Sequence, residues 1–251
     1  MVATPAWPPS SLPRLFIDAP LSEGLALTLD GAQANYLAAV LRLGAGAQIK
    51  AFDDRTGEWL ARIEEAGKRK VALRIERRLR EREEVPDLWL VFAPIKRGRI
   101  DWLVEKATEL GAARLVPVIT RRTIVDRLNL ERLRAHAIEA AEQCERTALP
   151  ELAEPAKLDL LLKEWPEDRA LYFADEAGGV PLADAVAAGP AALLIGPEGG
   201  FTDEERAAIS AVKQARPVSL GPRILRADTA AVAALAIWMS VAGDWKSTPR
   251  R

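Results

Sequence analysis

The pattern of apolar and polar positions divides the chain near Pro86. Before that point apolar and polar residues alternate in short runs such as Trp59–Ile63 and Val71–Ile75, as in strands with one buried face. Strands are therefore predicted at Arg14–Ile17, Leu25–Leu29, Gln48–Phe52, Glu58–Ile63 and Val71–Glu76. One helix is predicted over Ala32–Leu41, with Tyr36, Leu37, Val40 and Leu41 on its buried stripe. Together these elements favour a small β-barrel.

Beyond the polar stretch Arg80–Pro86, which is typical of a linker, strands alternate with helices. Continuous apolar runs indicate strands buried on both faces. They predict strands at Leu88–Phe92, Leu115–Ile119, Leu171–Ala174, Ala191–Ile195 and Val218–Leu220. Helices are predicted over Ile100–Leu110, from the cap Asn129 to about Glu145, after a capping box of Thr202 and Glu205, and over Ala227–Val241. This alternation predicts an α/β domain with a mainly parallel sheet.

Length and composition are consistent with two globular domains. The 251 residues are 49% apolar and 28% charged, enough to bury two cores. The chain has one cysteine, Cys144, and one histidine, which excludes an internal disulfide and a Cys/His zinc cluster. No long apolar run predicts a membrane span, and the N-terminus lacks a secretory pattern. We expect a soluble cytoplasmic protein without a metal ion.

Positive charge is concentrated in two segments, although the formal net charge is −1. Residues 68–82 contain eight Lys or Arg against two Glu, and residues 121–134 contain five Arg against one Asp and one Glu. Such clusters can follow a phosphate backbone, but a run of charge is more often the solvated face of a helix or strand. They support an RNA partner without establishing one.

Two turns that follow predicted strands carry the candidate chemistry. Ile195–Phe201 is Ile-Gly-Pro-Glu-Gly-Gly-Phe, and Leu220–Ala230 begins Leu-Gly-Pro-Arg. Ligands bind at such strand ends in open α/β folds, and glycine lets backbone groups approach them. Either turn alone is more readily a simple tight turn, but the two together can form two walls of one pocket. Neither matches the phosphate-binding patterns of dinucleotide or NTP sites.

Charged residues in these turns are candidates for catalysis. Glu198 can accept a proton or bind a cation, and Arg226 can stabilise negative charge that develops on a base. Asp228 is a further candidate, although it equally suits a cap of the last helix.

Four segments together resemble the RsmE family of 16S ribosomal RNA methyltransferases. They are Glu105–Ala112 (EKATELGA), Glu142–Leu152 (EQCERTALPEL), Leu193–Glu205 (LLIGPEGGFTDEE) and Leu220–Ala230 (LGPRILRADTA). Arg14–Phe16 and Val40–Leu43 resemble the small domain of that family, so the resemblance covers nearly the whole chain. It implies a PUA-like β-barrel over residues 1–82 and a SPOUT-type α/β domain over 83–251, with a deep trefoil knot and the cofactor site at about 171–241.

The resemblance also implies a reaction, in which S-adenosylmethionine donates a methyl group to N3 of a uridine in 16S ribosomal RNA, either free or in the small ribosomal subunit. The protein would be a homodimer. From the two turns themselves we expect backbone groups around Leu194, Gly196, Gly199, Leu220 and Leu225 to hold the cofactor, together with Ile195, Pro197, Gly200, Gly221, Ile224 and Ala230. Arg226 would stabilise charge on a uracil oxygen, and Glu198 or Asp228 would accept the proton. RNA would contact Arg14, Arg42, Lys96, Arg97, Arg121, Arg122 and Arg146.

Three features of the sequence depart from the family pattern, and they involve four residues. Asp228 replaces a usual Glu and is one methylene shorter, Glu145 replaces a usual Gly, and Asn35-Tyr36 replace a frequent His pair. Catalysis by histidine in the first domain is therefore not expected. Two other functions remain open, a knotted methyltransferase that acts on transfer RNA and a non-catalytic RNA-binding or ribosome-assembly factor.

Overall fold

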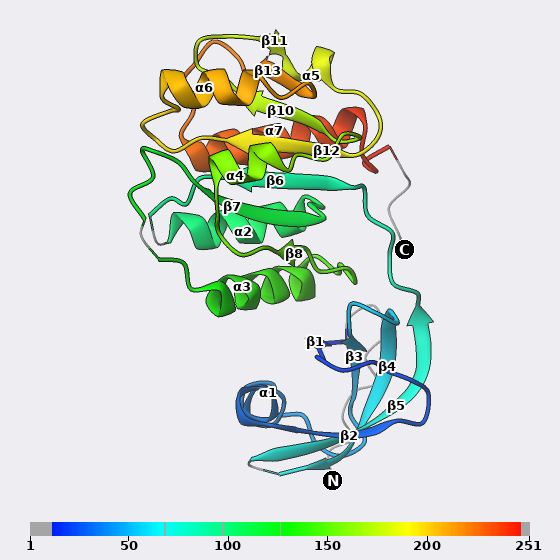
Figure 1. The fold of residues 1–251 in the computed structure, drawn as a ribbon. Helices are drawn as coiled ribbons and strands as arrows, with labels where there is room; N and C mark the ends of the chain where they lie inside the picture. The colour runs from blue at the N-terminus through cyan, green and yellow to red at the C-terminus, as the bar shows by residue number, and fades with distance from the viewer. Residues whose placement is uncertain (1–11, 68, 97, 126, 247–251) are drawn as a thin grey trace. The chain divides into compact units, whose positions relative to one another are not determined.

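The computed structural model describes residues 12–67, 69–96, 98–125 and 127–246, which form two compact units (Figure 1). The first unit extends to Glu84 and includes Ala141–Ala148. The second comprises Val85–Ala140 and the chain from Leu149 onward. No helix within the described ranges is both long and apolar enough to cross a membrane.

The first unit is built on a five-stranded sheet. Its elements are β1 (Arg14–Phe16), β2 (Ala26–Asp30), α1 (Gly31–Asn35), η2 (Tyr36–Val40), β3 (Gln48–Phe52), β4 (Glu58–Ala66) and β5 (Lys70–Arg80). The strand order is β1-β3-β4-β5-β2, and only β1 and β3 pair in parallel. The described strands β1 and β2 do not pair with each other, so the sheet is open rather than a closed barrel. Gln33 of α1 donates instead to the carbonyl of Phe16 at 2.7 Å, so the helix lies beside β1.

The helix predicted over Ala32–Leu41 forms as α1 followed by the π-helical turn η2. Leu37 is fully buried, but Tyr36 and Val40 are 36% and 61% exposed, so their expected place on the buried stripe is wrong. The amide of Leu41 donates to the carbonyl of Tyr36, five residues back. A turn of this width changes the angular spacing of side chains from that of an α-helix.

Residues 141–148 join the first unit because arginine and glutamate side chains hold their backbone. Nε of Arg14 binds the carboxylate of Glu58 at 2.6 Å, and its other nitrogens donate to the carbonyls of Glu142 (3.0 Å) and Arg146 (3.1 Å). Glu83 accepts from the amide of Thr147 at 2.7 Å. The stretch expected to be a linker is therefore partly strand β5 and partly fixed by hydrogen bonds.

The second unit is an α/β domain with an eight-stranded sheet. Its elements are β6 (Leu88–Phe92), α2 (Arg99–Glu109), β7 (Arg114–Ile119), α3 (Leu130–Gln143), β8 (Glu151–Leu152), β9 (Ala156–Lys157), α4 (Leu158–Lys163), β10 (Ala170–Ala174), β11 (Val180–Pro181), α5 (Leu182–Ala185), β12 (Ala191–Ile195), α6 (Asp203–Ser210), β13 (Ala215–Ser219) and α7 (Ala227–Val241). The order is β11-β13-β10-β12-β6-β7-β8, β9 also pairs with β7, and every pair is parallel. The predicted α/β fold with a parallel sheet is confirmed.

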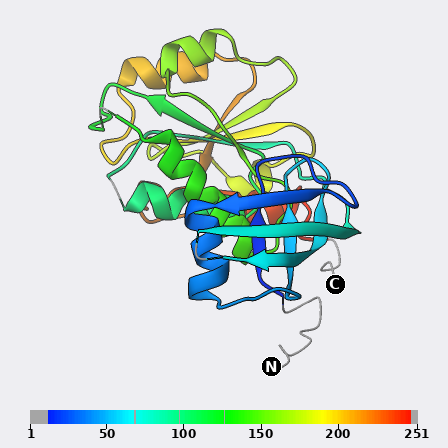
Figure 2. The ribbon, with the colours of Figure 1, turned by 90° about the horizontal axis from the view of Figure 1, so that it is seen from below.

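Alternate residues of β12 enter two different cores. Leu193 and Ile195 pack in a cluster with residues of α2, α5 and α7, whereas Leu194 packs in another with residues of α4 and α6. Figure 2 shows α4 and α6 on one side of this sheet and α2 and α7 on the other. Helices on both faces leave the carboxyl ends of the strands as the edge where loops can form a site.

Candidate functional site

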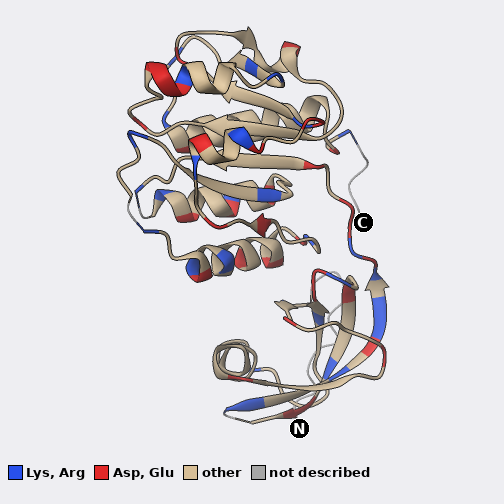
Figure 3. Cartoon of the chain, viewed as in Figure 1, with Lys and Arg blue, Asp and Glu red and all other residues tan. Residues whose placement is uncertain are grey.

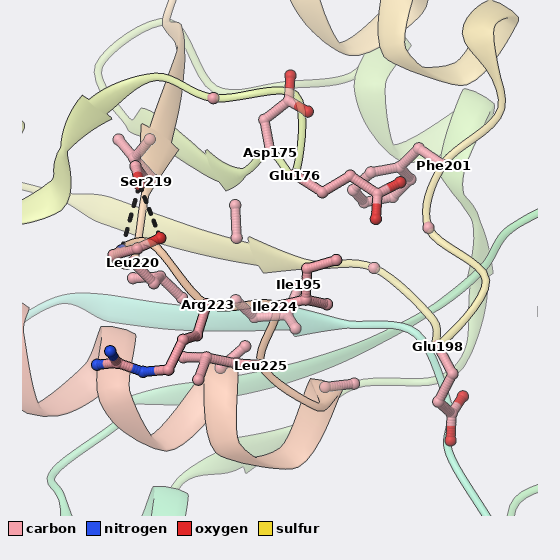
Figure 4. A pocket seen from close by; sticks show the side chains of 18 of the residues that line it. Asp175, Glu176, Ile195, Glu198, Phe201, Ser219, Leu220, Arg223, Ile224 and Leu225 are labelled. Atoms are coloured by element: carbon pink, nitrogen blue, oxygen red, sulfur yellow. Dashed lines mark hydrogen bonds between the residues drawn. The ribbon is translucent and has the colours of Figure 1, made fainter.

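A cavity of about 350 Å³ lies at the carboxyl ends of the neighbouring strands β10, β12 and β13 (Figure 4). The loop after β12 contributes Ile195, Gly196, Pro197, Glu198, Gly200 and Phe201, and the segment from the end of β13 contributes Ser219, Leu220, Gly221, Pro222, Arg223, Ile224 and Leu225. Ala174, Asp175, Glu176, Gly178, Arg206, Val218, Ala227 and Ala230 complete the lining. The two turns singled out in the sequence therefore do form two walls of one pocket.

Most residues expected to hold a cofactor lie in this lining, and two do not. Leu194 is fully buried and packs on the opposite face of the sheet from Ile195, because neighbouring strand residues point to opposite faces. Gly199 is outside the lining as well.

The loop after β12 is shaped by a tight turn and a capping box. The amide of Gly200 donates to the carbonyl of Pro197 at 2.9 Å, and Gly200 has a φ of 69°, a conformation that favours glycine. Thr202 then caps α6: its Oγ1 accepts from the amide of Glu205 at 3.2 Å, while Glu205 accepts from the amide of Thr202 at 2.9 Å. The predicted capping box is confirmed.

Each glycine of this loop also has a protein neighbour that a side chain would meet. A Cβ on Gly196 would lie 3.1 Å from the ring of Phe201, and one on Gly199 would lie 3.2 Å from Cδ of Arg122. A Cβ on Gly200 would lie 2.5 Å from Oε1 of Glu176. Close packing against these side chains accounts for the glycines, in addition to any approach of a ligand.

The turn after β13 is open to solvent. Gly221 has a φ of 110°, and its amide donates to Oγ of Ser219 at 3.2 Å, which fixes the change of direction. Ile224 is 89% exposed although it lines the pocket. An exposed apolar side chain at the mouth of a cavity is available to cover a ligand.

An acidic wall, which the sequence reasoning missed, faces this turn across the pocket. Asp175 and Glu176 follow β10, and Arg206 of α6 pairs with the carboxylate of Asp175 and lies 3.9 Å from that of Glu176. Figure 4 shows Asp175 and Glu176 on one side of the pocket and Arg223 on the other. Two acidic residues directly after the buried run Leu171–Ala174 were the available signal.

The three candidate catalytic residues are placed differently. Glu198 lines the pocket, but its side chain points away from the other labelled residues in Figure 4. Arg226 is exposed at the N-cap of α7, outside the lining. Asp228 lies in the first turn of α7 and pairs with Arg99 at 3.3 Å, so the cap position belongs to Arg226 and not to Asp228. The structure thus brings only Glu198 to the pocket wall.

Two of the residues expected to contact RNA are buried. Arg14 and Arg146 are 8% and 5% exposed, and Arg14 is bound to Glu58 and to carbonyl groups of the first unit. Burial opposes the charged form and lowers the pKa of Arg146, although the nearby carboxylate of Glu83 acts in the opposite direction. This burial and these contacts disfavour a direct contact of either side chain with an RNA phosphate.

The other expected RNA contacts are accessible where the structure describes them. Arg42, Lys96, Arg121 and Arg122 are exposed, and Arg97 lies outside the described residues. Lys96 follows β6, and Arg121 and Arg122 follow β7, at the carboxyl edge of the sheet where the pocket also lies.

Several arginines of the basic segment around β5 are paired with acidic side chains. Arg74 binds Glu64 at 2.8 Å, Arg80 binds Glu58 at 3.0 Å and Arg82 binds Asp54 at 3.1 Å. Figure 3 shows Lys and Arg along β5 with acidic residues on the same unit. This pairing favours the solvated-face interpretation of the segment over phosphate binding. No group of three or more His, Cys, Asp or Glu in the described ranges is placed to hold a metal ion.

Comparison with known protein families shows to which class of protein the two units belong. A family described as the RNA methyltransferase domain matches residues 81–239, and one described as the RNA methyltransferase PUA domain matches residues 29–76. The first match includes both pocket turns. The molecule therefore has the domains of an RNA methyltransferase.

Individual relatives show which family of RNA methyltransferases the chain belongs to. The ribosomal RNA small subunit methyltransferase E of Rickettsia conorii is 31% identical over 89% of this chain and 93% of its own length, and that of a Synechocystis species is 35% identical over 84% and 71%. A methyltransferase of Legionella pneumophila solved with bound SAM is 34% identical, with a TM-score of 0.85 over 93% of this chain and 99% of that one. The SAM-bound small subunit methyltransferase E of Neisseria gonorrhoeae is 27% identical, with a TM-score of 0.86 over the same shares. The chain belongs to the ribosomal RNA small subunit methyltransferase E family.

Proposed function

We propose that this chain is an enzyme that transfers a methyl group from S-adenosylmethionine to N3 of a uridine in 16S ribosomal RNA. The observation that carries the proposal is the single pocket formed by the loops after β12 and β13, since both family motifs converge on it. The solved relatives that bind SAM and the names of the curated relatives support the same cofactor and substrate class.

The residues of the pocket suit this cofactor. Ile195, Leu225 and Ala230 offer apolar surface for the adenine ring and the methylene groups of the cofactor, and the volume of about 350 Å³ lies in the range of small-molecule sites. Asp175 and Glu176 place carboxylates where a cation or a ribose hydroxyl can bind. When bound, S-adenosylmethionine supplies an electrophilic methyl group.

The protein's own contribution is positioning and charge stabilisation. Uridine N3 carries a weakly acidic proton, which a carboxylate of Glu198 or Asp228 accepts in this proposal. Arg226, at the start of α7, stabilises the negative charge that then spreads to a uracil oxygen. Exposed Lys96, Arg121 and Arg122 hold phosphates of the RNA at the same edge of the sheet.

We also infer the finer architecture of the family for this chain. Residues 1–82 would form the PUA-like domain and 83–251 a SPOUT domain, with the trefoil knot at about 171–241; the adjacency of β13, β10 and β12 and the shared pocket of their loops support this. Val232 and Ile237 of α7 remain partly exposed, which supports a homodimer that covers them. We propose a cytoplasmic location as well, which a ribosomal RNA substrate would support.

Mass mapping of ribosomal RNA from cells that lack the gene tests the proposal. We expect one 16S uridine to lose a methyl group and to regain it when the wild-type gene is returned, but not with Arg226→Ala. Loss of methylation on a transfer RNA instead would reassign the substrate, and unchanged RNA together with no binding of S-adenosylmethionine in calorimetry would leave a non-catalytic RNA-binding protein. Methylation in vitro of free 16S RNA and of assembled subunits distinguishes the two forms of substrate.

A further inference from the structure

Arg122, in the loop after β7, contacts the loop after β12, residues 196–202, which we call the glycine loop. Its Nη1 donates to the carbonyl of Gly199, and its aliphatic stem lies across the same residue, 3.2 Å from the position of a Cβ. Gly199 does not have the positive φ of Gly200. The missing side chain at position 199 therefore serves the approach of Arg122 and not the turn itself.

A second contact joins the same two loops. The backbone amide of Arg121 donates to Oε1 of Glu205 at 2.7 Å, while Oε2 of Glu205 accepts from the amide of Thr202 at the end of the glycine loop. The loop after β7 is itself braced, because the amide of Thr120 donates to Oγ1 of Thr123 at 2.9 Å. A braced turn thus holds the glycine loop at residues 199 and 202.

We propose that Arg122 is a positioning residue that holds the Gly199 peptide and couples RNA binding to cofactor binding. A guanidinium has five N–H donors, so an RNA phosphate and the Gly199 carbonyl can share it. A cofactor that orders the glycine loop also orders Arg122, which makes the later binding of a phosphate less costly in side-chain entropy. Thermodynamic linkage is reciprocal, so RNA must raise the affinity for the cofactor by the same factor by which the cofactor raises the affinity for RNA. The identity of the two ligands rests on the proposed function, but the positioning role does not.

Hydrogen exchange on the ligand-free full-length protein tests the positioning role. The amide of Gly200, bonded to the carbonyl of Pro197 in the wild type, should exchange about three to ten times faster in Arg122→Ala, the range expected for loss of one supporting hydrogen bond. The amides of β12 should not change. Arg121→Ala is the matched control, because it removes the same charge from the same loop but keeps the backbone contact with Glu205. Equal exchange of Gly200 in wild type and Arg122→Ala would overturn the proposal.

A double-mutant cycle tests the contact from its other side. Gly199→Ala should speed exchange at Gly200 in the wild-type background, because the new methyl group displaces the stem of Arg122. In the Arg122→Ala background the same substitution should have little effect, since Cδ of Arg122, the atom in tight contact, is gone and Cβ lies at an ordinary contact distance of 3.5 Å. Additive effects would contradict a direct contact.

Calorimetry with S-adenosylmethionine, with and without a 16S RNA fragment, tests the coupling. RNA should strengthen cofactor binding about fivefold in the wild type, at the low end of measured couplings, and not at all in Arg122→Ala, with Arg122→Lys in between. Arg121→Ala should weaken RNA binding but keep the coupling factor. If RNA still strengthens cofactor binding by the wild-type factor in Arg122→Ala, the proposal that Arg122 carries the coupling is wrong. If the wild type bound no cofactor, the proposed function and the coupling would both fail, whereas the exchange experiments would still decide the positioning role.

Discussion

At the scale of single residues, Asp53 shows how one buried carboxylate fixes a turn. It is 2% exposed and accepts from the amides of Leu21 (2.6 Å), Arg55 (2.9 Å) and Thr56 (2.7 Å), and from the hydroxyl of Thr56 (2.7 Å). Burial raises its pKa, but these hydrogen bonds outweigh burial and hold the pKa below the usual value of 3.8. The charged form is therefore more stable in the folded protein than in the unfolded chain.

Asp53→Ala should lower the free energy of unfolding by about 2–3 kcal/mol at neutral pH, because buried amides lose their acceptor. Since the folded-state pKa is lowered, the carboxylate's contribution is complete above its unfolded pKa and disappears as the pH falls through the folded value. Urea unfolding at pH 7 and below pH 4 should thus show a difference between variant and wild type that shrinks in acid. The exposed Glu23→Gln is the control, and an equal loss at both pH values would contradict this account.

The type of a residue indicates some local backbone conformations, but it does not indicate which arginine side chains are buried. Glu145 has a φ of 60°, and this left-handed conformation explains why the family pattern has a glycine there. Arg14 is separated by 44 residues from Glu58 and by 132 from Arg146, the partners that bury it. Contacts at such separation leave no periodic signal, so a buried arginine and an RNA-binding arginine look alike in the sequence.

At the scale of elements, the cap of α6 ends the glycine loop. Thr202→Ala removes one half of a reciprocal capping box and should destabilise the protein by about 1 kcal/mol. Because Thr202 directly follows Phe201, which lines the pocket, S-adenosylmethionine should also bind more weakly, which calorimetry can measure. Thr202→Ser keeps the hydroxyl and should restore both properties; failure of Ser to do so would mean that the methyl group of Thr202 matters more than its oxygen.

The amino ends of three strands are joined by Arg169, at the edge opposite the pocket. Arg169 donates to the carbonyls of Asp87 and Ala191 at 3.1 Å each, binds the Asp87 carboxylate at 2.6 Å and stacks 3.8 Å from the ring centroid of Trp89. Arg169→Met should lower stability by about 2–3 kcal/mol, and Arg169→Lys should not fully rescue it, because an ammonium lacks the planar fork. Thermal unfolding measures both, with exposed Arg216→Met as the matched control. Full rescue by Lys would show that charge alone suffices.

Elements were predicted best where a local signal existed. The capping oxygen of Asn129 accepts from the amide of Arg132 at 2.9 Å, as the sequence predicts for the start of α3. The strand expected over Glu58–Ile63 extends to Ala66, and its partner β5 reaches Arg80 through polar residues. Three register shifts interrupt the pairing of β4 with β5, which nevertheless continues through charged residues as far as Arg80. Such irregular strands do not keep a regular alternation of apolar and polar residues, so the sequence pattern does not predict their ends.

At the scale of the whole molecule, the change of periodicity at Pro86 indicated the division of the chain near Glu84, and the Gly-Pro turns after two strands indicated the pocket. What did not follow was any feature that needs distant segments to meet. The return of residues 141–148 to the first unit depends on hydrogen bonds to Arg14 and Glu83. The acidic wall depends on Arg206 of α6 reaching Asp175 after β10. Tertiary contacts of this kind are set by the fold, and a single sequence does not display them.

The distribution of accessible charge predicts how RNA binding depends on salt. The log of the association constant should fall with log salt, and Lys96→Ala and Arg121→Ala should each reduce that slope by about 1, because each removes one phosphate contact. Arg74→Ala removes the same charge from β5, but its guanidinium is already paired with Glu64, so the slope should not change. Titrations of a 16S fragment over a range of salt concentrations measure all three. A flat slope for the wild type would reject phosphate contacts altogether. An equal reduction in Arg74→Ala would instead show that RNA also contacts the basic segment of the first unit.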